Sequence, residues 1–303
     1  MTLRQSLPTL LGVTALIALT ACNATDSNSS NGTGSLSLNI TDAAVDNADH
    51  VYVTFTGVTI KHENDEPQAF EFDEPRRIDL LALQGDAFDS LFADETVRAG
   101  RYEWVSLHVE ALRGQLDSSI VIGDEEHSLF VPSGAQSGLK LVRGFDVPVN
   151  QAASFTIDFD LRKSVINPRG FPDYILKPTL RLVDNSEVGH IRGTVNLGDY
   201  NCSEEGNAVY VYDGRDAELF DLNDQRDDSE NPLTTANVQL NPETGDYEFS
   251  VGFLTEGDYT VAFTCDADLD DPEVENTLVF KDSQTATVKA GEYTEVEFAA
   301  SNE

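Results

Sequence analysis

The stretch Phe155-Thr156-Ile157-Asp158-Phe159-Asp160-Leu161 alternates apolar and polar side chains without interruption. Successive side chains of a β-strand point to opposite faces, so this alternation places the four apolar side chains together on one face. Both aspartates then lie on the other face, about 6.5 to 7 Å apart at the rise of a strand. The stretch therefore predicts a strand that buries its apolar face and turns two neighbouring carboxylates away from the core.

Strand-like patterns of this kind fill most of the chain on both sides of that stretch. The segments are 36–40, 51–60 with a break at Gly57, 68–72, 102–111, 119–122, 128–131, 174–183, 190–195, 208–212, 247–251, 259–263, 277–280, 285–288 and 293–298. Residues 80–93 differ, because their leucines and phenylalanines can be grouped at helical spacing around Gly85. We expect a mainly β protein of two sandwich- or barrel-like domains, the first with a short helical insert.

The N-terminus has the features of an export signal. Arg4 precedes an apolar run over residues 10–19, which is long enough for a signal-peptide core and too short to span a bilayer. The run ends in Leu19-Thr20-Ala21-Cys22, which resembles the lipobox of bacterial lipoproteins. That resemblance implies a signal peptide over 1–21 and a lipid such as palmitate on Cys22. The alternatives are an ordinary secretory signal and a retained transmembrane helix.

The next dozen residues, 23–34, read NATDSNSSNGTG and contain no large apolar side chain, which predicts a flexible tether. We therefore divide the mature chain into a tether over 22–34, a β-rich domain over 35–185 and a C-terminal β-sandwich over 186–303. Asn23 follows the cysteine where the sorting rule of Gram-negative lipoproteins would need aspartate for inner-membrane retention. The expected location is the outer membrane, lipid-anchored, on its periplasmic face or at the cell surface.

The charge balance is strongly acidic. Fifty-four acidic and nineteen basic residues give a formal net charge of −35. Such a field repels nucleic acid, and the sequence offers no basic patch to bind it, so nucleic-acid binding is excluded. The carboxylates indicate either a solvated surface or divalent-cation binding. Hydrophobic residues make up 40% of the chain, which is enough for packed cores, and we expect a monomer.

Two cysteines remain once Cys22 is assigned to the lipid. Disulfides persist in exported proteins, so Cys202 and Cys265 are expected to pair. The alternative is that both are buried free thiols.

A set of short motifs between Gly34 and Asp184 resembles, in its order, the domain-of-unknown-function 4382 family. The motifs are Asp42-Ala43-Ala44-Val45, Asp79-Leu80-Leu81-Ala82-Leu83, Ala99-Gly100-Arg101-Tyr102, Val131-Pro132-Ser133-Gly134, Gly138-Leu139-Lys140-Leu141, Ile157-Asp158-Phe159-Asp160 and Tyr174-Ile175-Leu176-Lys177-Pro178. Ala44 departs from the pattern, since proline is expected there. The resemblance implies a bacterial lipoprotein with this domain after its lipobox, and it assigns no activity.

The C-terminal part carries Gly245-Asp246-Tyr247-Glu248-Phe249 and Gly257-Asp258-Tyr259-Thr260-Val261. These phrases are similar to carboxypeptidase-regulatory-like and prealbumin-type sandwiches, in which a glycine turn precedes a tyrosine-bearing strand. The resemblance implies a β-sandwich for this part of the chain.

Enzyme motifs are missing from the sequence. It contains no Gly-x-Ser-x-Gly elbow, no His-Glu-x-x-His, no Walker loop and no Rossmann glycine set. A catalytic triad of Ser133, His108 and a carboxylate is still possible, because the members of a triad can occur in any order in the sequence. The alternative is that Ser133 simply belongs to a turn between strands. We expect no enzyme, and a hydrolase is the least favoured function.

The candidate metal site consists of alternating acids, Asp266, Asp268, Asp270 and Glu273. They resemble the start of an EF-hand loop, in which several carboxylate oxygens converge on calcium. A true EF-hand is excluded, because Asp271 stands where it needs glycine and Thr277 where it needs glutamate. The alternative is a solvated acidic loop. A second acidic loop, 221–230, could lie nearby if the cysteines pair.

A second candidate site is polar and comprises Asp158, Asp160 and Lys177. It would bind a hard cation or another ligand, and the alternative is simple ion pairing with Lys177, Arg162, Lys163 or Arg181.

The function that these observations favour is non-enzymatic binding, adhesion or a structural role in the cell envelope, with an unidentified polysaccharide or protein ligand. The alternatives are a carbohydrate-binding module and a calcium-binding envelope protein, and calcium is the one cofactor considered. A sugar binder would show a flat row of exposed aromatic rings, for which the local supply is Tyr200, Tyr210, Tyr212 and Tyr247.

Overall fold

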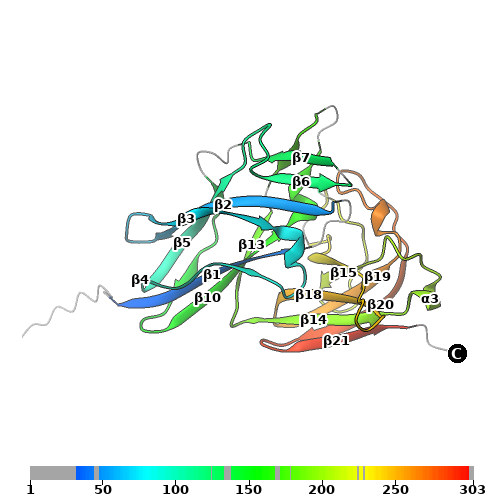
Figure 1. Cartoon of the computed structure of the whole chain (residues 1–303). Coiled ribbons are helices and arrows are strands. Elements are labelled where there is room, and N and C mark those ends of the chain that lie inside the picture. The colour runs from blue at the N-terminus through cyan, green and yellow to red at the C-terminus, as the bar shows by residue number, and fades with distance from the viewer. Residues whose placement is uncertain are drawn as a thin grey trace, which may run out of the picture. The chain divides into compact units, whose positions relative to one another are not determined.

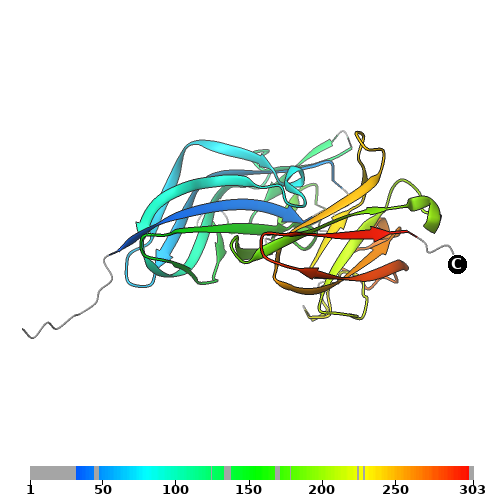
Figure 2. The same cartoon turned by 90° about the horizontal axis from the view of Figure 1, so that it is seen from below.

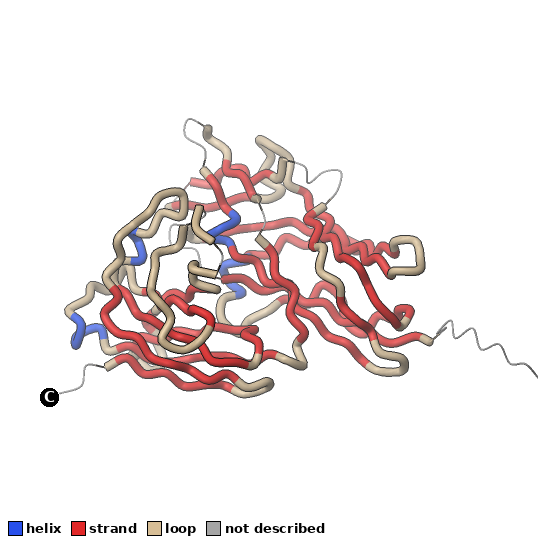
Figure 3. Tube along the Cα trace, turned by 180° about the vertical axis from the view of Figure 1, so that it is seen from behind, coloured by secondary structure: helices blue, strands red, loops and turns tan. Residues whose placement is uncertain are grey.

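The computed structural model of the protein describes residues 32–43, 48–123, 125–132, 138–167, 171–177, 179–223, 225–227 and 229–299. The expected signal peptide, Cys22, most of the tether and Ser133 lie outside these ranges. Nearly every element is a strand, as Figure 3 shows, which confirms the mainly β class. Residues Asn31–Glu303 form one compact unit.

Two sheets form from the strands that precede residue 185 (Figure 1). A four-stranded sheet has the order β13-β10-β1-β4, and a nine-stranded sheet has the order β11-β12-β7-β6-β2-β5-β8, with β3 on β2 and β9 on β5. In the first sheet β1 and β10 run parallel. The strands are β1 Thr33–Ala43, β2 His50–His62, β3 Gln68–Asp79, β4 Asp89–Arg98, β5 Gly100–Glu110, β6 Ser119–Ile122, β7 Glu125–Phe130, β8 Leu139–Leu141, β9 Phe145–Val147, β10 Ala152–Asp160, β11 Val165–Ile166, β12 Tyr174–Leu176 and β13 Leu180–Asp184.

The core of this half confirms the alternation in β10. Phe155, Ile157, Phe159 and Leu161 are all buried in one apolar cluster, and the Phe159 ring meets Phe55 edge-on at 6.2 Å. Each such side chain contributes roughly 1.5 to 3 kcal/mol through the apolar area that it buries. The predicted break in the second strand is also present, since the β2 pairings shift register between Phe55 and Gly57.

Two further four-stranded sheets, with the orders β17-β18-β14-β21 and β16-β15-β19-β20, form from later strands. They enclose a second apolar cluster around Phe249, Phe263 and Phe298. Figure 2 shows β14 beside β21, with which it pairs in parallel. Within the described residues, no strand before residue 185 pairs with a later one. The elements are β14 Val188–Val195, α3 Leu197–Tyr200, β15 Ala208–Asp213, β16 Thr234–Asn237, β17 Gln239–Leu240, β18 Tyr247–Thr255, β19 Gly257–Thr264, η2 Ala267–Leu269, β20 Phe280–Val288 and β21 Tyr293–Phe298.

The helical insert is shorter than residues 80–93. Only η1, Leu80–Leu83, is helical, and the following segment forms β4, which pairs antiparallel with β1. The prediction was wrong for β4 because pairing with a neighbouring strand outweighed a local apolar spacing that fits a helix. Another short helix among the described residues is α2, Leu161–Ser164. None of the helices in the described ranges is long and apolar enough to span a membrane.

The predicted strand over 174–183 is two strands in different sheets. β12 joins the nine-stranded sheet and β13 the four-stranded one, with Lys177 donating its backbone N–H to Ser164 between them. The predicted segment 277–280 is likewise replaced by a strand that begins at Phe280.

Candidate functional site

A groove of about 740 Å³ lies where the two halves of the compact unit meet. We call it the junction groove. Its floor is the face of the β17-β18-β14-β21 sheet that is turned away from the second core, and its end is formed by the turn after η1. The lining residues are Gln84, Gly85, Asp86, Arg192, Gly193, Thr194, Asn237, Gln239, Leu240, Asn241, Pro242, Glu248, Phe249, Ser250, Tyr293 and Glu295.

Strand alternation presents the polar side chains of the groove. On β14, Ile191 and Val195 are buried in the second core, so Arg192 and Thr194 point the other way. The strand pairings then set their neighbours, because Arg192 lies opposite Glu295 on β21 and opposite Ser250 on β18. The floor of the groove is therefore a polar sheet face.

Each charged group in the groove has a hydrogen-bond partner. Arg192 Nε donates to Glu295 Oε1 at 2.7 Å, and this hydrogen bond raises the pKa of the guanidinium. The Tyr293 hydroxyl donates to the Asp86 carboxylate, which raises the pKa of the tyrosine. Glu248 accepts from Asn241 Nδ2 and from a threonine hydroxyl, each at 2.9 Å.

Several neutral groups in the groove have no such partner. The Oδ1 atom of Asn237 is buried without a hydrogen bond within the described part of the chain. The side chains of Gln84, Gln239, Thr194 and Ser250 also lack a hydrogen bond to any described residue, although each lines the same groove. The groove side chains that remain able to hydrogen-bond a ligand are therefore amides and hydroxyls.

Close backbone contact holds the two halves together at the groove. A Cβ atom on Gly252 of β18 would lie 2.0 Å from the carbonyl oxygen of Gly85, and one on Gly85 would lie 2.7 Å from Ser250. Gly85 also has a positive φ of 72°, which L side chains adopt only with strain. Beside this contact the rings of Phe88 and Phe253 meet edge-on at 6.5 Å.

We expect Gly252→Ala to lower the free energy of unfolding by about 2 kcal/mol, because the added methyl group forces β18 and the Gly85 turn apart. Chemical denaturation of the whole chain measures the change. Gly198→Ala is the matched control, since the nearest atom to a Cβ there is Asn196 Oδ1 at 3.4 Å. Equal stability of the two variants would mean that the halves do not meet through Gly252.

His190 packs beside the groove with its ring among other rings. It stacks on Tyr293 at 5.0 Å and meets Phe253 edge-on at 5.4 Å, and its Nδ1 is buried without a partner among the described residues. Burial lowers the pKa of His190, although Asp86 opposes this effect. The folded state therefore binds fewer protons at this site than the unfolded state.

The stabilisation linked to His190 should be complete above about pH 6.5 and lost as the pH falls below it. We expect the unfolding free energy of the wild type to fall more than that of His190→Phe between about pH 7.5 and about pH 5. The phenylalanine keeps the ring contacts and cannot titrate. Parallel pH profiles for the two proteins would show that His190 does not contribute.

The structure does not bring the predicted polar site together as one group. Asp158 is buried, and its Oδ2 accepts from Arg181 Nε at 3.1 Å and Nη2 at 2.7 Å. Asp160 caps α2 by accepting from the Lys163 backbone N–H at 3.2 Å, and it pairs with the Lys163 ammonium at 3.3 Å. Both aspartates are therefore ion-paired, Asp158 with Arg181 and Asp160 with Lys163.

The assignment of Lys177 to this site stays a prediction. Its side chain is exposed, and no ion pair among the described residues joins its ammonium to either aspartate, although nearby Thr179 accepts a hydrogen bond from the Asp160 backbone N–H at 3.1 Å. Asp158 instead lines a small cavity with Thr41, Thr234 and Ser250, so strands of the second half cover the face that the sequence predicted to be open.

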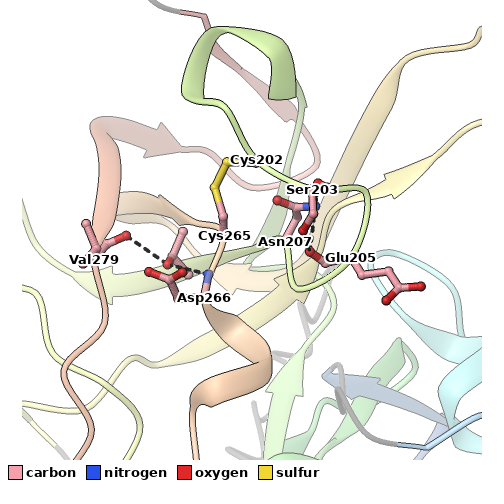
Figure 4. The surroundings of a disulfide bond; sticks show 8 residues. Cys202, Ser203, Glu205, Asn207, Cys265, Asp266 and Val279 are labelled. Atoms are coloured by element: carbon pink, nitrogen blue, oxygen red, sulfur yellow. Dashed lines mark hydrogen bonds between the residues drawn. A yellow bond between two sulfur atoms is a disulfide. The ribbon is translucent and has the colours of Figure 1, made fainter.

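The expected disulfide is present. Cys202 and Cys265 are joined with their Cα atoms 5.7 Å apart, which links the segment after α3 to the end of β19 (Figure 4). The two acidic loops also lie together as expected, because the Asn276 backbone N–H donates to Asp221 and Gln225 Nε2 donates to the Glu273 carbonyl at 3.2 Å.

The four acids of the candidate metal site do not converge. Asp270 turns inward, where its Oδ2 accepts from the Tyr210 hydroxyl at 2.6 Å and from the Leu222 backbone N–H at 3.3 Å. Across the described ranges no group of three or more His, Cys, Asp or Glu side chains could hold a metal ion. The loop that carries Asp266, Asp268, Asp270 and Glu273 is therefore held by hydrogen bonds. The alternation of these acids in the sequence does not bring their carboxylates around one point.

Three of the four tyrosines that a sugar binder could have used as a flat row of rings do not form one. Tyr210 and Tyr212 are buried against Phe280, and the Tyr200 hydroxyl bonds to Asp282 at 2.9 Å. Both buried residues lie on β15, a central strand whose two faces are covered. The exposed tyrosine beside a groove is Tyr293, which the sequence did not single out.

On the nine-stranded sheet, the His108 imidazole lies between a hydroxyl group and a carboxylate. Its Nε2 lies 2.7 Å from Thr59 Oγ1, and its Nδ1 lies 3.4 Å from Glu71 Oε1. The order matches a nucleophile, a base and an orienting acid. The three side chains do not line the junction groove.

Fold and groove together define a mainly β protein with an open polar groove between its two halves. Residues 33–178 match the family model described as Domain of unknown function (DUF4382). This match confirms the family resemblance of the first half. A comparison with curated proteins gave no match.

Solved structures give distant similarities. The Bacillus anthracis TIE protein is 13% identical over 88% of this chain and 33% of its own, with a TM-score of 0.19. The minor pilin GBS52 of Streptococcus agalactiae is 8% identical over 88% of this chain and 98% of its own, with a TM-score of 0.20. The shaft pilin SpaA of Lactobacillus rhamnosus is 10% identical over 90% and 99%, with a TM-score of 0.21. The chain spans a third of the length of the TIE protein.

Proposed function

We propose that this protein is a cell-envelope lipoprotein of the binding or adhesion type, anchored in the outer membrane through Cys22, and that the junction groove is its ligand site. Two β-rich domains, 35–185 and 186–303, form the scaffold. The observation that carries the proposal is the groove itself, where amides and hydroxyls are left open while the charged side chains already have hydrogen-bond partners. Such a surface can bind, and it holds no nucleophile and base in contact.

The direction of β1 supports an anchored protein that holds its groove away from the anchor. At one end of β1, Gly32 accepts a hydrogen bond from the Ala99 backbone at 2.8 Å, and the tether would join here. At the other end, Thr41 shares a cavity with Gly85 and Ser250, which both line the junction groove. A strand of this length spans about 35 Å, so the groove would lie that far from the tether.

Lipid labelling tests the anchor. Cells that express the chain are fed an alkyne analogue of palmitate, and label is measured on the purified protein. We expect label on the wild type, none on Cys22→Ser, and full label on Cys265→Ser, which loses a cysteine outside the lipobox. Absence of label on the wild type would indicate an ordinary secretory signal and overturn the anchor.

Sedimentation with washed cell envelopes tests binding. The Cys22→Ser chain is used because it lacks the lipid, alone and with Thr194→Trp, which fills the floor of the groove. We expect saturable co-sedimentation that Thr194→Trp abolishes and that Thr285→Trp, on an exposed position of β20 outside the groove, leaves unchanged. Binding that is equally strong with Thr194→Trp would remove the groove from the proposal.

A further inference from the structure

We propose that the junction groove takes a neutral sugar chain as its ligand. This inference rests on the proposed function, because it names the ligand class of the same groove.

The groups left open in the groove decide between charged and neutral ligands. Gln84, Gln239 and Asn237 are amides, and Thr194 and Ser250 are hydroxyls, so the set contains both donors and acceptors. A sugar hydroxyl also donates and accepts, and it can satisfy every one of these groups. A cationic ligand only donates, and would leave the amide N–H groups of the groove without acceptors.

The charges of the groove point the same way. The net charge of the chain is −35, and the groove contains Asp86, Glu248 and Glu295, so an anionic ligand is repelled. These carboxylates are already engaged by Tyr293, Asn241 and Arg192 respectively. A charged ligand would have to compete with these hydrogen bonds, whereas a neutral one leaves them in place.

Asn237 supplies a second, independent observation. Its Oδ1 is buried and accepts no hydrogen bond from the described residues, although the residue lines the groove. A buried acceptor without a donor is unfavourable, and native proteins seldom leave one. A ligand hydroxyl that donates to Asn237 would remove this deficit.

The apolar surfaces of the groove suit the C–H face of a sugar ring. Leu240 is 52% exposed and lines the groove, whereas the Tyr293 ring stacks on His190 at 5.0 Å and lies under the Arg192 guanidinium at 4.7 Å. A cleft of about 740 Å³ lies within the ordinary size of a small-ligand site. Exposed apolar surface beside open amides is the combination that a ring with one apolar face and a rim of hydroxyls requires.

Affinity electrophoresis tests the ligand class directly. The full chain with Cys22→Ser is run through native gels cast with dextran, mannan, xylan or a soluble β-glucan. Gels with alginate and with polylysine provide an anionic and a cationic polymer. The same gels carry Thr194→Trp and the control Thr285→Trp, and thermal unfolding checks that both variants fold.

We expect at least one neutral polysaccharide to retard the protein, and Thr194→Trp to weaken that retardation at least about tenfold, a loss of roughly 1.4 kcal/mol of binding free energy. Thr285→Trp should migrate with the parent protein. Retardation by alginate or polylysine alone, equal retardation of both tryptophan variants, or no retardation in any neutral gel would overturn the sugar assignment.

The two proposals fail in different ways. If cell envelopes bind the protein through Thr194 but no neutral polysaccharide does, the binding function stands and the ligand class is wrong. If Thr194→Trp has no effect on envelope binding, the proposed function loses its site before any ligand class is considered.

Discussion

Replacing both Cys202 and Cys265 with alanine should lower the free energy of unfolding by about 4 kcal/mol. The bridge closes a loop whose ends are 63 residues apart in sequence, and loop closure restricts the unfolded chain far more than the folded one. Urea denaturation of the wild type and the double variant measures the difference. The loss should appear at the denaturation midpoint as well as in the extrapolated free energy.

Reduction of the wild type provides the matched control for this prediction. Dithiothreitol should shift the wild type by the same amount as the two substitutions and should leave the double variant unchanged. A double variant as stable as the oxidised wild type would mean that the folded contacts around α3 and β19 hold the loop without the bridge.

Removing the Arg181 guanidinium should be nearly as costly as removing the disulfide. Asp158 is buried at the end of β10, and Arg181 supplies both of its hydrogen bonds from a side chain. Arg181→Ala would leave a buried carboxylate without its partner, so we expect a loss of about 3 kcal/mol in unfolding free energy. Arg192→Ala, which breaks the exposed pair with Glu295, should cost under about 1 kcal/mol.

The pH dependence of this loss identifies its cause. Burial raises the pKa of Asp158 even beside Arg181, and the guanidinium opposes that effect. In Arg181→Ala the carboxyl would bind its proton more tightly when folded than when unfolded, so stability would fall as the pH rises above about 4. The deficit should therefore be smaller at acidic pH, and adding Asp158→Asn should restore part of the lost stability. A deficit that is independent of pH would assign the effect to lost packing instead.

Local patterns of the sequence predicted those parts of the fold that depend on neighbouring residues. Strict alternation in β10 gave its buried face, and Gly57 marked the register shift in β2. The cysteine pair followed from the number of cysteines and the compartment. Residues 89–93 were misassigned because β4 is fixed by its pairing with β1, fifty residues earlier in the chain, which no local spacing reports.

The candidate site depended on contacts between distant segments and was therefore missed. The polar residues Arg192 and Thr194 alternate with buried ones, and this signal could have marked an exposed strand face. Nothing in the sequence joins that face to Gln84 or Asn237, which reach the groove from other elements. The sequence predicted an exposed pair of carboxylates, but strands of the second half cover Asp158. This contact between distant segments cannot be read from a local pattern either.

The parallel pairs in both halves have a consequence for the order in which the chain can fold. β1 pairs with β10, which follows it by more than a hundred residues, and β14 pairs with β21, the last strand described. In each half the first strand is synthesised long before its parallel partner. Long-range pairings of this kind fold slowly and leave strand edges exposed to aggregation in the meantime. A nascent chain should therefore depend on a chaperone until its late strands emerge, and a truncation before Tyr293 should leave β14 as an open edge that recruits other copies.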